Sequence, residues 1–403
     1  MRNILALVVV LMLHAEGAMS AVVGQESARR KAESVGLCRE MSLVAMASGE
    51  APAYYVFNAS ALDGGFVIVS GDDRVGDVLG YSDRGCFSPD DLPPALIDWL
   101  SEWEEQILEI REGRLALPSR VARAPHPSIA PMLTTKWGQQ SPYSRMTPEY
   151  REYCHSATGC LAVAMAQLLK YWASDTPTDS IPAYVTDTRK LEVEALPPTT
   201  FNYAIMEDYY DDRSPLDEGL FEVAKLMRYC GQAAKMDYDI NSGAVTSGEY
   251  LVKYFGFATG YTDKYHVTHM TNWEDLLYAE LEAGRPMLYS GKKINGSGHV
   301  FVVDGYEDDY FHINWGWNGN YNGFFKVTAA NRDNPSGGSF TDGYRYAQMA
   351  VIGLRPANAT AVTMPRHDNS SAQQLVYDLQ GHRVNAPAGK GIYIIGGKKV
   401  AVK

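Results

Sequence analysis

The most informative part of this 403-residue chain is the segment Ala157-Thr158-Gly159-Cys160-Leu161-Ala162-Val163-Ala164-Met165-Ala166-Gln167. Thr158 and Gly159 can cap a helix that holds Cys160 in its first turn and runs to about Trp172. A helix N-terminus carries about half a positive charge, which stabilises a thiolate over a thiol. With an imidazolium beside it, the pKa of such a cysteine can fall from about 8.5 to about 3.5–7.5. The alternative is a small core cysteine on an alanine-rich helix.

A histidine stands at the start of a predicted core strand, in the segment Gly296-Ser297-Gly298-His299-Val300-Phe301-Val302-Val303-Asp304-Gly305. The glycines leave the backbone open before His299, and the apolar run after it is typical of a buried strand. His299 is therefore expected at the edge of that strand, beside an accessible gap. The alternative is a histidine with a structural role only.

An amide and two indoles are expected near this histidine. They belong to the segment Tyr310-Phe311-His312-Ile313-Asn314-Trp315-Gly316-Trp317-Asn318-Gly319. A short turn at Glu307-Asp308 predicts a hairpin in which His299 lies opposite residues 314–316. Asn314 would then fix the imidazole tautomer, as a catalytic base requires, and the two tryptophans would shield that contact from water. The alternative is aromatic core packing, which we expect for at least one of Trp315 and Trp317.

A glutamine precedes the cysteine in the segment Lys136-Trp137-Gly138-Gln139-Gln140-Ser141-Pro142-Tyr143. Its amide can donate a hydrogen bond to an oxyanion, together with the backbone N–H of Cys160. Glutamine, cysteine, histidine and asparagine thus follow one another in the order that papain-like peptidases use. A second cysteine with a histidine neighbour, Cys154 beside His155, lies outside the helix start.

Composition and charge narrow the class of protein. Hydrophobic residues make up 46% and charged residues 21% of the chain, which is typical of a globular protein. The formal net charge of −12 argues against nucleic acid or an anionic membrane surface as a partner. The five cysteines are odd in number, so at least one cannot pair within the chain; they are Cys38, Cys86, Cys154, Cys160 and Cys230. We expect neither a metal nor an organic cofactor.

The first two parts of the chain are a leader and a small domain. Residues 1–20 have the basic start, short apolar core and small residues of a signal peptide, which predicts export. Residues 21–123 predict an α+β unit with a helix over 26–48, strands at 54–57 and 66–69, and an amphipathic helix over 93–110. The apolar positions of that last helix are Leu96, Leu100, Trp103, Ile107 and Ile110. An exposed connector rich in arginine and proline, of the kind that proteases cut, is expected from Arg111 to Pro131.

The other two parts are a large domain and a tail. Residues 124–356 contain every candidate catalytic residue, with further helical patterns over 220–230 and 273–283 and strands after them. Residues 357–403 begin with a polar stretch and end in strand-like pieces at 375–379 and 391–395, followed by Lys398-Lys399-Val400. We expect an appended β-hairpin module outside the main core.

Taken together, these segments resemble the streptopain family of secreted bacterial cysteine peptidases, which have a papain-like core. The similarity lies in Trp137-Gly138-Gln139, Thr158-Gly159-Cys160 with Met165-Ala166-Gln167, Gly298-His299 with Val303-Asp304-Gly305, and Asn314–Gly319. The front part resembles the family's inhibitory propeptide in Gly65–Asp73 and Leu79–Ser82, so that the similarity covers residues 26–356. The tail departs from it and resembles the C-terminal sorting modules of exported Bacteroidetes proteins; a short hairpin without a sorting role is the alternative.

The resemblance implies an α+β fold: a helical part and an antiparallel sheet or barrel part, preceded by a small α+β propeptide and followed by a short β module. Cys160 would be the nucleophile, His299 the general base and Gln139 the oxyanion donor, with Asn314-Trp315 in the hairpin that flanks the histidine. Ser242 and Gly243, which follow Asp237-Tyr238, would line one wall of the substrate cleft and Gly298 the other. Residues 334–343 match a glycine-rich loop of the family that is shorter in this chain.

The expected function is that of an exported cysteine endopeptidase made as a zymogen, released from the cell or held at its surface. Its partners would be protein or peptide substrates and its own propeptide, without nucleic acid and without stable membrane insertion. Two alternatives stay open: an inactive binding protein on the same fold, and an acyl transferase, which shares the thiol–imidazole chemistry. The propeptide-like front favours proteolysis, because a secreted peptidase endangers the cell that makes it.

Overall fold

The chain is described here by a computed structural model that covers residues 21–38, 40–61, 63–115, 126–258, 273–292, 298–327 and 346–358. It also covers the strand residues 376–377, 383–384, 391–395 and 398–402. Residues 1–20, 116–125 and 334–343, to which the predicted signal peptide, the middle of the connector and the glycine-rich loop belong, lie outside these ranges.

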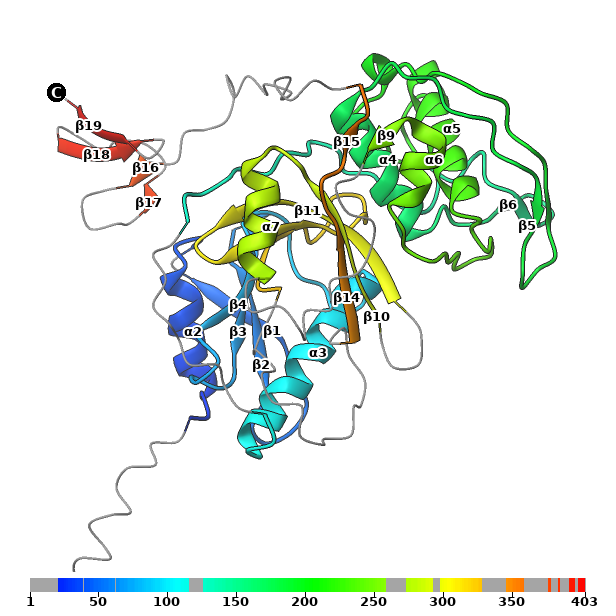
Figure 1. Cartoon of the computed structure of the whole chain (residues 1–403). Coiled ribbons are helices and arrows are strands. Elements are labelled where there is room, and N and C mark those ends of the chain that lie inside the picture. The colour runs from blue at the N-terminus through cyan, green and yellow to red at the C-terminus, as the bar shows by residue number, and fades with distance from the viewer. Residues whose placement is uncertain are drawn as a thin grey trace, which may run out of the picture.

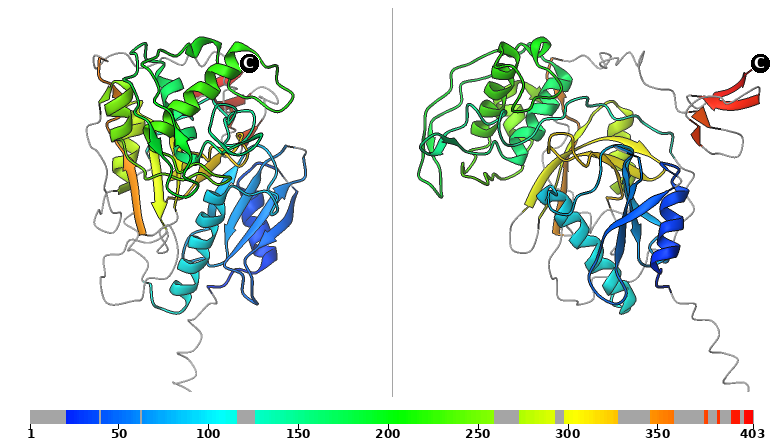
Figure 2. Two further views of the ribbon diagram at one scale, coloured as in Figure 1. Left: turned by 90° about the vertical axis from the view of Figure 1, so that its right-hand side faces the viewer. Right: turned by 180° about the vertical axis from the view of Figure 1, so that it is seen from behind.

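The front domain is an antiparallel sheet between two helices. Its elements are α2 (Gln25–Ser34), β1 (Met41–Met46), β2 (Tyr54–Ala59), β3 (Phe66–Ser70), β4 (Val78–Ser82) and α3 (Pro94–Arg111). Figures 1 and 2 show α2 and α3 on opposite sides of the strands. Alternate side chains of the strands face each helix: Phe57 and Val67 pack with Ala28, whereas Val56 and Ile68 pack with Leu96. The strands at 54–57 and 66–69 and the helix over 93–110 are confirmed.

The predicted helix over residues 26–48 is wrong in its second half. Helix α2 ends at Ser34, Gly36 follows with a φ of +84°, and residues 41–46 form the edge strand β1. The residues of β1 are Met, Ser, Leu, Val and Ala, of which several favour helices in isolation. The antiparallel pairing of Met41 with Ala59 through Met46 with Tyr55 overrides that local preference.

The large domain has a helical half built around the helix of the cysteine. Its helices are α4 (Cys160–Trp172), η1 (Tyr203–Ile205), α5 (Glu218–Ala233) and α6 (Glu249–Phe255). Short two-stranded ribbons accompany them: β5 (Glu149–Arg151) with β6 (Cys154–His155), β7 (Tyr184–Val185) with β8 (Glu192–Val193), and β9 (Phe257–Ala258) with β15 (Arg355–Pro356). The predicted helices α4 and α5 are confirmed, while η1 and α6 were not expected from the sequence.

The other half of this domain is a sheet. It comprises α7 (Trp273–Glu282) and the strands β10 (Met287–Lys292), β11 (Gly298–Glu307), β12 (Tyr310–Asn314), β13 (Gly323–Phe325) and β14 (Tyr346–Val351). These strands continue the front domain in a single nine-stranded antiparallel sheet of order β1-β2-β3-β4-β13-β12-β11-β10-β14. The junction is short, with Phe324 opposite Tyr81 and Phe325 opposite Gly80. The α+β class with a helical half and an antiparallel sheet is confirmed, whereas the continuity of the sheet across both domains was not predicted.

Strand β11 separates the two hydrophobic cores of the large domain. Val300 and Val302 belong to the core formed with α4 and α5, and Phe301 and Val303 belong to the core shared with α3 of the front domain. Because successive side chains of a strand point to opposite faces, β11 presents one face to the helical half and the other to the front domain.

The C-terminal part forms a sheet of its own. Strands β16 (Val376–Tyr377), β17 (Arg383–Val384), β18 (Gly391–Ile395) and β19 (Lys398–Val402) assemble in the order β17-β16-β18-β19. The two strand-like pieces predicted at 375–379 and 391–395 correspond to β16 and β18, which pair with each other, and β17 and β19 extend this sheet on either side. Among the residues that the structure describes, no helix has the length and apolar character needed to cross a membrane.

Candidate active site

Cys160 is the first residue of helix α4, as predicted. Gly159 occupies the N-cap position with a φ of +85°, and a Cβ atom there would stand 2.6 Å from the Met236 sulfur. Only glycine combines this backbone conformation with this close approach. The predicted side-chain cap is not formed: the Thr158 hydroxyl donates to the Gln139 carbonyl instead, at 3.4 Å.

The Cys160 thiol is half-buried, and its environment favours the neutral form. Burial raises the pKa of the Cys160 thiol, although hydrogen bonds from the backbone N–H groups of Val300 and Leu161 act in the opposite direction. The sequence predicted a lowered pKa, from the helix N-terminus and a neighbouring imidazolium. The helix terminus is present, but desolvation outweighs the backbone hydrogen bonds to the thiol.

His299 is the second residue of β11 and lies opposite Gly291 of β10. Its side chain shares the parity of Phe301, so it faces the front domain. There its Nε2 atom lies 3.6 Å from Oδ2 of Asp98 in helix α3. The imidazole is 26% exposed, and the Asp98 side chain is 9% exposed. Cys160 packs against the core on the other face of the strand, and the backbone N–H of Val300, the residue after His299, bonds its thiol. The His299 side chain is thus directed toward α3, whereas Cys160 packs with the core of the helical half.

Gln139 lies in a segment, residues 135–139, that runs beside the N-terminus of α4; we call it the strap. The Gln139 carbonyl accepts a hydrogen bond of 2.9 Å from the backbone N–H of Thr158, two residues before Cys160. Gly138 contacts Asn318 so closely that a Cβ atom would stand 2.1 Å from its side-chain oxygen. The predicted proximity of Gln139 to the cysteine therefore exists in the structure.

Asn314 does not lie opposite His299. The predicted turn at Glu307-Asp308 is wrong: Glu307 pairs with Tyr310, so the turn lies at Asp308-Asp309. A bulge at Asp304 then shifts the pairing of β11 and β12 by one residue, and the observed register pairs Asn314 with Val302. Asn314 therefore shares the face of Val302, toward α4, whereas His299 occupies the other face. The amide of Asn314 bonds Thr135, Gln167 and the N–H of Gly316, which uses all four of its hydrogen-bonding positions. Asn314 therefore has no hydrogen-bonding position left for the expected contact with the imidazole.

Trp315 is a core residue. It is 1% exposed, its Nε1–H donates to the Tyr321 carbonyl at 2.9 Å, and its ring lies 4.9 Å from that of Phe301 and 5.1 Å from that of Phe325. Aromatic packing, expected for at least one of the two tryptophans, thus applies to Trp315. Trp317 is half-buried at the edge of the same core.

The residues expected in the cleft walls lie on two sides of Cys160. Ser242 belongs to a tight turn in which its hydroxyl contacts the backbone of Asp239, and its carbonyl oxygen would stand 3.3 Å from a Cβ atom at Gly159. Gly243 is exposed and pairs with Asp237 through two backbone hydrogen bonds. Gly298 is exposed at the start of β11, opposite Lys292. Within the described ranges, no group of three or more histidine, cysteine or acidic side chains is arranged to hold a metal ion.

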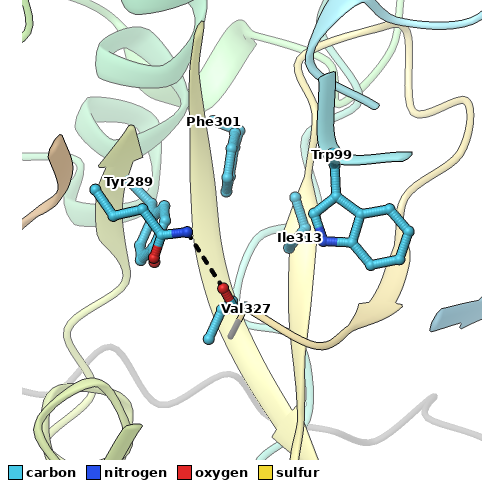
Figure 3. Close-up of a pocket in the computed structure, with 6 residues that line it drawn as sticks. Trp99, Tyr289, Phe301, Ile313 and Val327 are labelled. Carbon is cyan, nitrogen blue, oxygen red and sulfur yellow. Dashed lines mark hydrogen bonds between the residues drawn. The ribbon is translucent and has the colours of Figure 1, made fainter. Parts of the chain in front are cut away.

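Helix α3 covers the sheet of the large domain close to His299. Trp99 donates from its Nε1–H to the Lys326 carbonyl at 3.0 Å and packs edge-on against Phe325 with ring centres 5.2 Å apart. Trp99 lines a small cavity of about 20 Å³ together with Tyr289, Phe301, Ile313, Val327 and Gln348. Figure 3 shows Trp99 beside Ile313. A cavity of this size holds about one water molecule.

Two polar residues of this region were not predicted from the sequence. Asp98 and Gln167 are both buried polar residues on amphipathic helices, 6% and 0% exposed. Asp98 could have been found from the sequence, because it is a charged residue among the apolar positions Leu96, Leu100 and Trp103. Gln167 belongs to the motif that contains Cys160, but its partners come from segments 30 and 147 residues away and have no local signature.

The chain was compared with family models and with known proteins. Residues 137–325 match the model of the peptidase C10 family, and residues 15–107 match that of the Spi protease inhibitor. Streptopain of Streptococcus pyogenes is 29% identical over 75% of this chain and 80% of its own. The thiol protease/hemagglutinin PrtT of Porphyromonas gingivalis is 29% identical over 78% of this chain, which spans only 38% of PrtT.

The architecture agrees with these matches. A fragment of prointerpain A from Prevotella intermedia superposes with a TM-score of 0.62 at 28% identity, over 78% of this chain and 99% of the fragment. That fragment belongs to a proform, prointerpain A. The resemblance inferred from the sequence motifs is thereby confirmed. Residues 137–325 thus form a domain of the peptidase C10 family, that of streptopain, and a Spi-type propeptide domain precedes them.

Proposed function

We propose that this chain is the zymogen of an exported cysteine endopeptidase whose nucleophile is Cys160 and whose general base is His299. The Cys160 thiolate attacks the peptide carbonyl to form a thioester, and His299 gives its proton to the leaving amine. Gln139 and the backbone N–H of Cys160 stabilise the oxyanion. The observation that carries this proposal is the position of Cys160 at a helix N-terminus, with the strap of Gln139 on one side and the strand of His299 on the other.

Latency in this proposal comes from the face of β11 that His299 occupies. The imidazole lies with Asp98 of α3, while the thiol lies with Val300 on the other face. An imidazole held toward α3 cannot take the thiol proton, and the thiol, whose pKa is raised by desolvation, stays neutral. Release of α3 removes the carboxylate partner and frees the start of β11 to turn His299 toward Cys160. The front domain, residues 21 to about 123, then acts as the intramolecular inhibitor.

The proposed activating cut lies in the connector, and its flanks narrow the position. Before the connector, Leu115 is buried and its N–H bonds the Glu109 carbonyl. After it, His126 stacks on Tyr278 with ring centres 4.0 Å apart, and Ile129 pairs with Tyr306 through two backbone hydrogen bonds. Peptide bonds held in this way fit poorly into a protease cleft. We therefore place the cut between Leu115 and His126.

The test compares the intact precursor with the form cut between these residues. Peptide hydrolysis is measured at equal protein concentration, with the Cys160→Ala precursor as a matched control. We expect the cut form to be at least 100-fold more active, and the Cys160→Ala precursor to accumulate uncut if processing is autocatalytic. Equal activity of precursor and cut form would refute latency, and the front domain would then be a folding aid. Incorporation of amines into glutamine by the cut form, without peptide hydrolysis, would identify the acyl transferase instead.

A further inference from the structure

A buried glutamine of the cysteine helix has no part in the chemistry proposed above. Gln167 follows Cys160 by seven residues, about two turns, so both side chains emerge from the same side of α4. Gln167 is fully buried, at 0% exposure. A buried amide costs free energy unless it is hydrogen-bonded, so the partners of Gln167 show what it holds in place.

The partners of Gln167 come from two other elements. Its Oε1 atom accepts from the backbone N–H of Trp137 at 3.4 Å and from Nδ2 of Asn314 at 3.2 Å. Its Nε2 atom donates to Oδ1 of Asn314 at 3.3 Å, so the two amides form a reciprocal pair. Asn314 also donates to the Thr135 carbonyl at 2.8 Å and accepts from the N–H of Gly316 at 3.1 Å. We call these two side chains the amide pair.

The amide pair connects the three parts of the candidate site. Gln167 belongs to the helix of Cys160, Asn314 ends a strand of the same sheet as β11, and both bond the strap at Thr135 and Trp137. The strap is held from its outer side as well, since the Lys136 N–H bonds the Asp208 carbonyl at 2.7 Å and the Trp137 indole bonds the Glu207 carbonyl at 3.0 Å. Gln139 stands two residues beyond Trp137, at the end of this held segment.

We propose that Gln167 and Asn314 are positioning residues that set the place of Gln139 relative to Cys160. The inference rests on the proposed oxyanion role of Gln139. A network that is buried on every side fixes the strap within a few tenths of an ångström, which an oxyanion donor needs in order to act on the transition state. Asn314 lies on the α4 face of the sheet and thus acts by holding the strap in place. It does not contact the imidazole.

The expected effect is moderate. Three of the bonds are 3.2–3.4 Å long, toward the weak end of the range for N–H···O bonds. Loss of an oxyanion donor costs about 10²–10³ in kcat, and a misplacement of about 1 Å can cost about 10². We therefore expect loss of the amide pair to lower kcat about tenfold, with KM nearly unchanged.

The experiment uses the cut, active enzyme and the variant Gln167→Met, which keeps the bulk of the side chain and removes its hydrogen bonds. The matched control is Gln232→Met in α5. Gln232 is 1% exposed and donates to the carbonyls of Pro182 and Glu194, but it does not touch the strap. Both variants lose buried amide bonds of the same kind. Only Gln167→Met should lower kcat at a temperature where both are folded.

A double variant identifies the route of the effect. If Gln167 acts through Gln139, the double variant Gln139→Ala/Gln167→Met is no slower than Gln139→Ala alone. Alkylation of Cys160 by iodoacetamide, which forms no oxyanion, should proceed at the same rate in Gln167→Met and in the parent enzyme. If Gln167→Met does not fold, Gln167→Asn keeps an amide on a side chain shorter by one methylene group and should show an intermediate kcat.

The outcomes separate this inference from the proposed function. An unchanged kcat in Gln167→Met, or a loss that multiplies with that of Gln139→Ala, would overturn the positioning role and leave the oxyanion assignment intact. Slower alkylation would also overturn it, because the effect would then lie in the thiol. A silent Gln139→Ala would remove the oxyanion assignment and, with it, the inference.

Discussion

The two seams that meet at β11 are built differently. The seam toward the front domain consists of a junction of two paired residues on each side, apolar contacts of α3, the contact of Asp98 with His299, and bonds such as Tyr81 to Glu307 at 2.9 Å. The seam toward the helical half contains the fully buried amides of Gln167 and Asn314. A buried network of reciprocal amide bonds is costly to open, whereas a mostly apolar face with a short strand junction and one carboxylate–imidazole contact can separate and be covered again.

This difference indicates which contacts maintain latency and which contacts support catalysis. The proform must release one seam without disturbing the other, because the same strand carries His299 and the backbone that faces Cys160. Changes at the front seam should therefore alter latency and leave the cut enzyme unaffected. Changes at the helical seam should alter turnover in the cut enzyme.

The largest expected effect concerns the helical seam. In the cut enzyme, Cys160→Ala should lower kcat by at least about 10⁴, the scale observed when a nucleophile is removed from a hydrolase. The fold should persist, since the two side chains differ little in bulk. The measurement is peptide hydrolysis together with the thermal midpoint of unfolding. Near-normal turnover would overturn the assignment of the nucleophile.

The next effect, also at this seam, is that of Gln139. Gln139→Ala should lower kcat of the cut enzyme about 10²–10³-fold and change KM little, because an oxyanion donor acts mainly on charge that develops in the transition state. Steady-state kinetics with one peptide substrate separate the two constants. An increase confined to KM would instead make Gln139 a substrate-binding residue.

The front seam is tested by Asp98→Asn in the precursor. Loss of the carboxylate beside His299 should raise residual activity of the uncut precursor about tenfold, which corresponds to about 1.4 kcal/mol of lost preference for the latent state. Glu104→Gln on the same helix is the matched control, since it removes one charge where Tyr54, a residue of the front domain, is the neighbour. The cut enzyme should be unaffected by either change. Equal leakage from both variants would contradict a specific role of Asp98.

A smaller effect, a shift in pH, distinguishes the states of the thiol. Burial raises the pKa of Cys160 in the proform, so the thiolate should appear only above the ordinary cysteine value of about 8.5. Its alkylation by iodoacetamide should therefore accelerate at a higher pH in the precursor than in the cut enzyme, where His299 can stabilise the thiolate. Rates measured between pH 5 and pH 10 give both midpoints. Identical profiles would show that removal of the front domain leaves the thiol environment unchanged.

The smallest effect is expected at the other cysteine with a histidine neighbour. Cys154 lies in β6, and its sulfur accepts a hydrogen bond from Arg151 at 3.2 Å. This ribbon lies outside both seams, so Cys154→Ser should leave kcat, KM and latency within twofold of the parent values. Kinetics of the cut enzyme check this, with Cys160→Ser as the comparison. A large loss in Cys154→Ser would give this cysteine a role that the structure does not suggest.

Local sequence determined much of this protein. The start of α4 at Cys160, the buried strand after His299 and the helix over 93–110 follow from caps, apolar runs and helical periodicity, which depend on neighbours in the chain. The α+β class of the front domain and the separate C-terminal strands follow from the same patterns, whereas the two-part fold of the large domain was implied by the family resemblance. The motifs together sufficed to indicate the peptidase family.

Tertiary structure alone decided which face each residue occupies. The bulge at Asp304 shifted the register so that Asn314 faces α4, and pairing with β2 made residues 41–46 a strand in spite of their composition. Asp98 lies beside His299 although 201 residues separate them in the sequence, and Gln167 bonds Asn314, which is 147 residues away. Such contacts depend on how sheets and helices stack, and a strand reverses every side chain with a shift of one residue, so no local pattern can specify them.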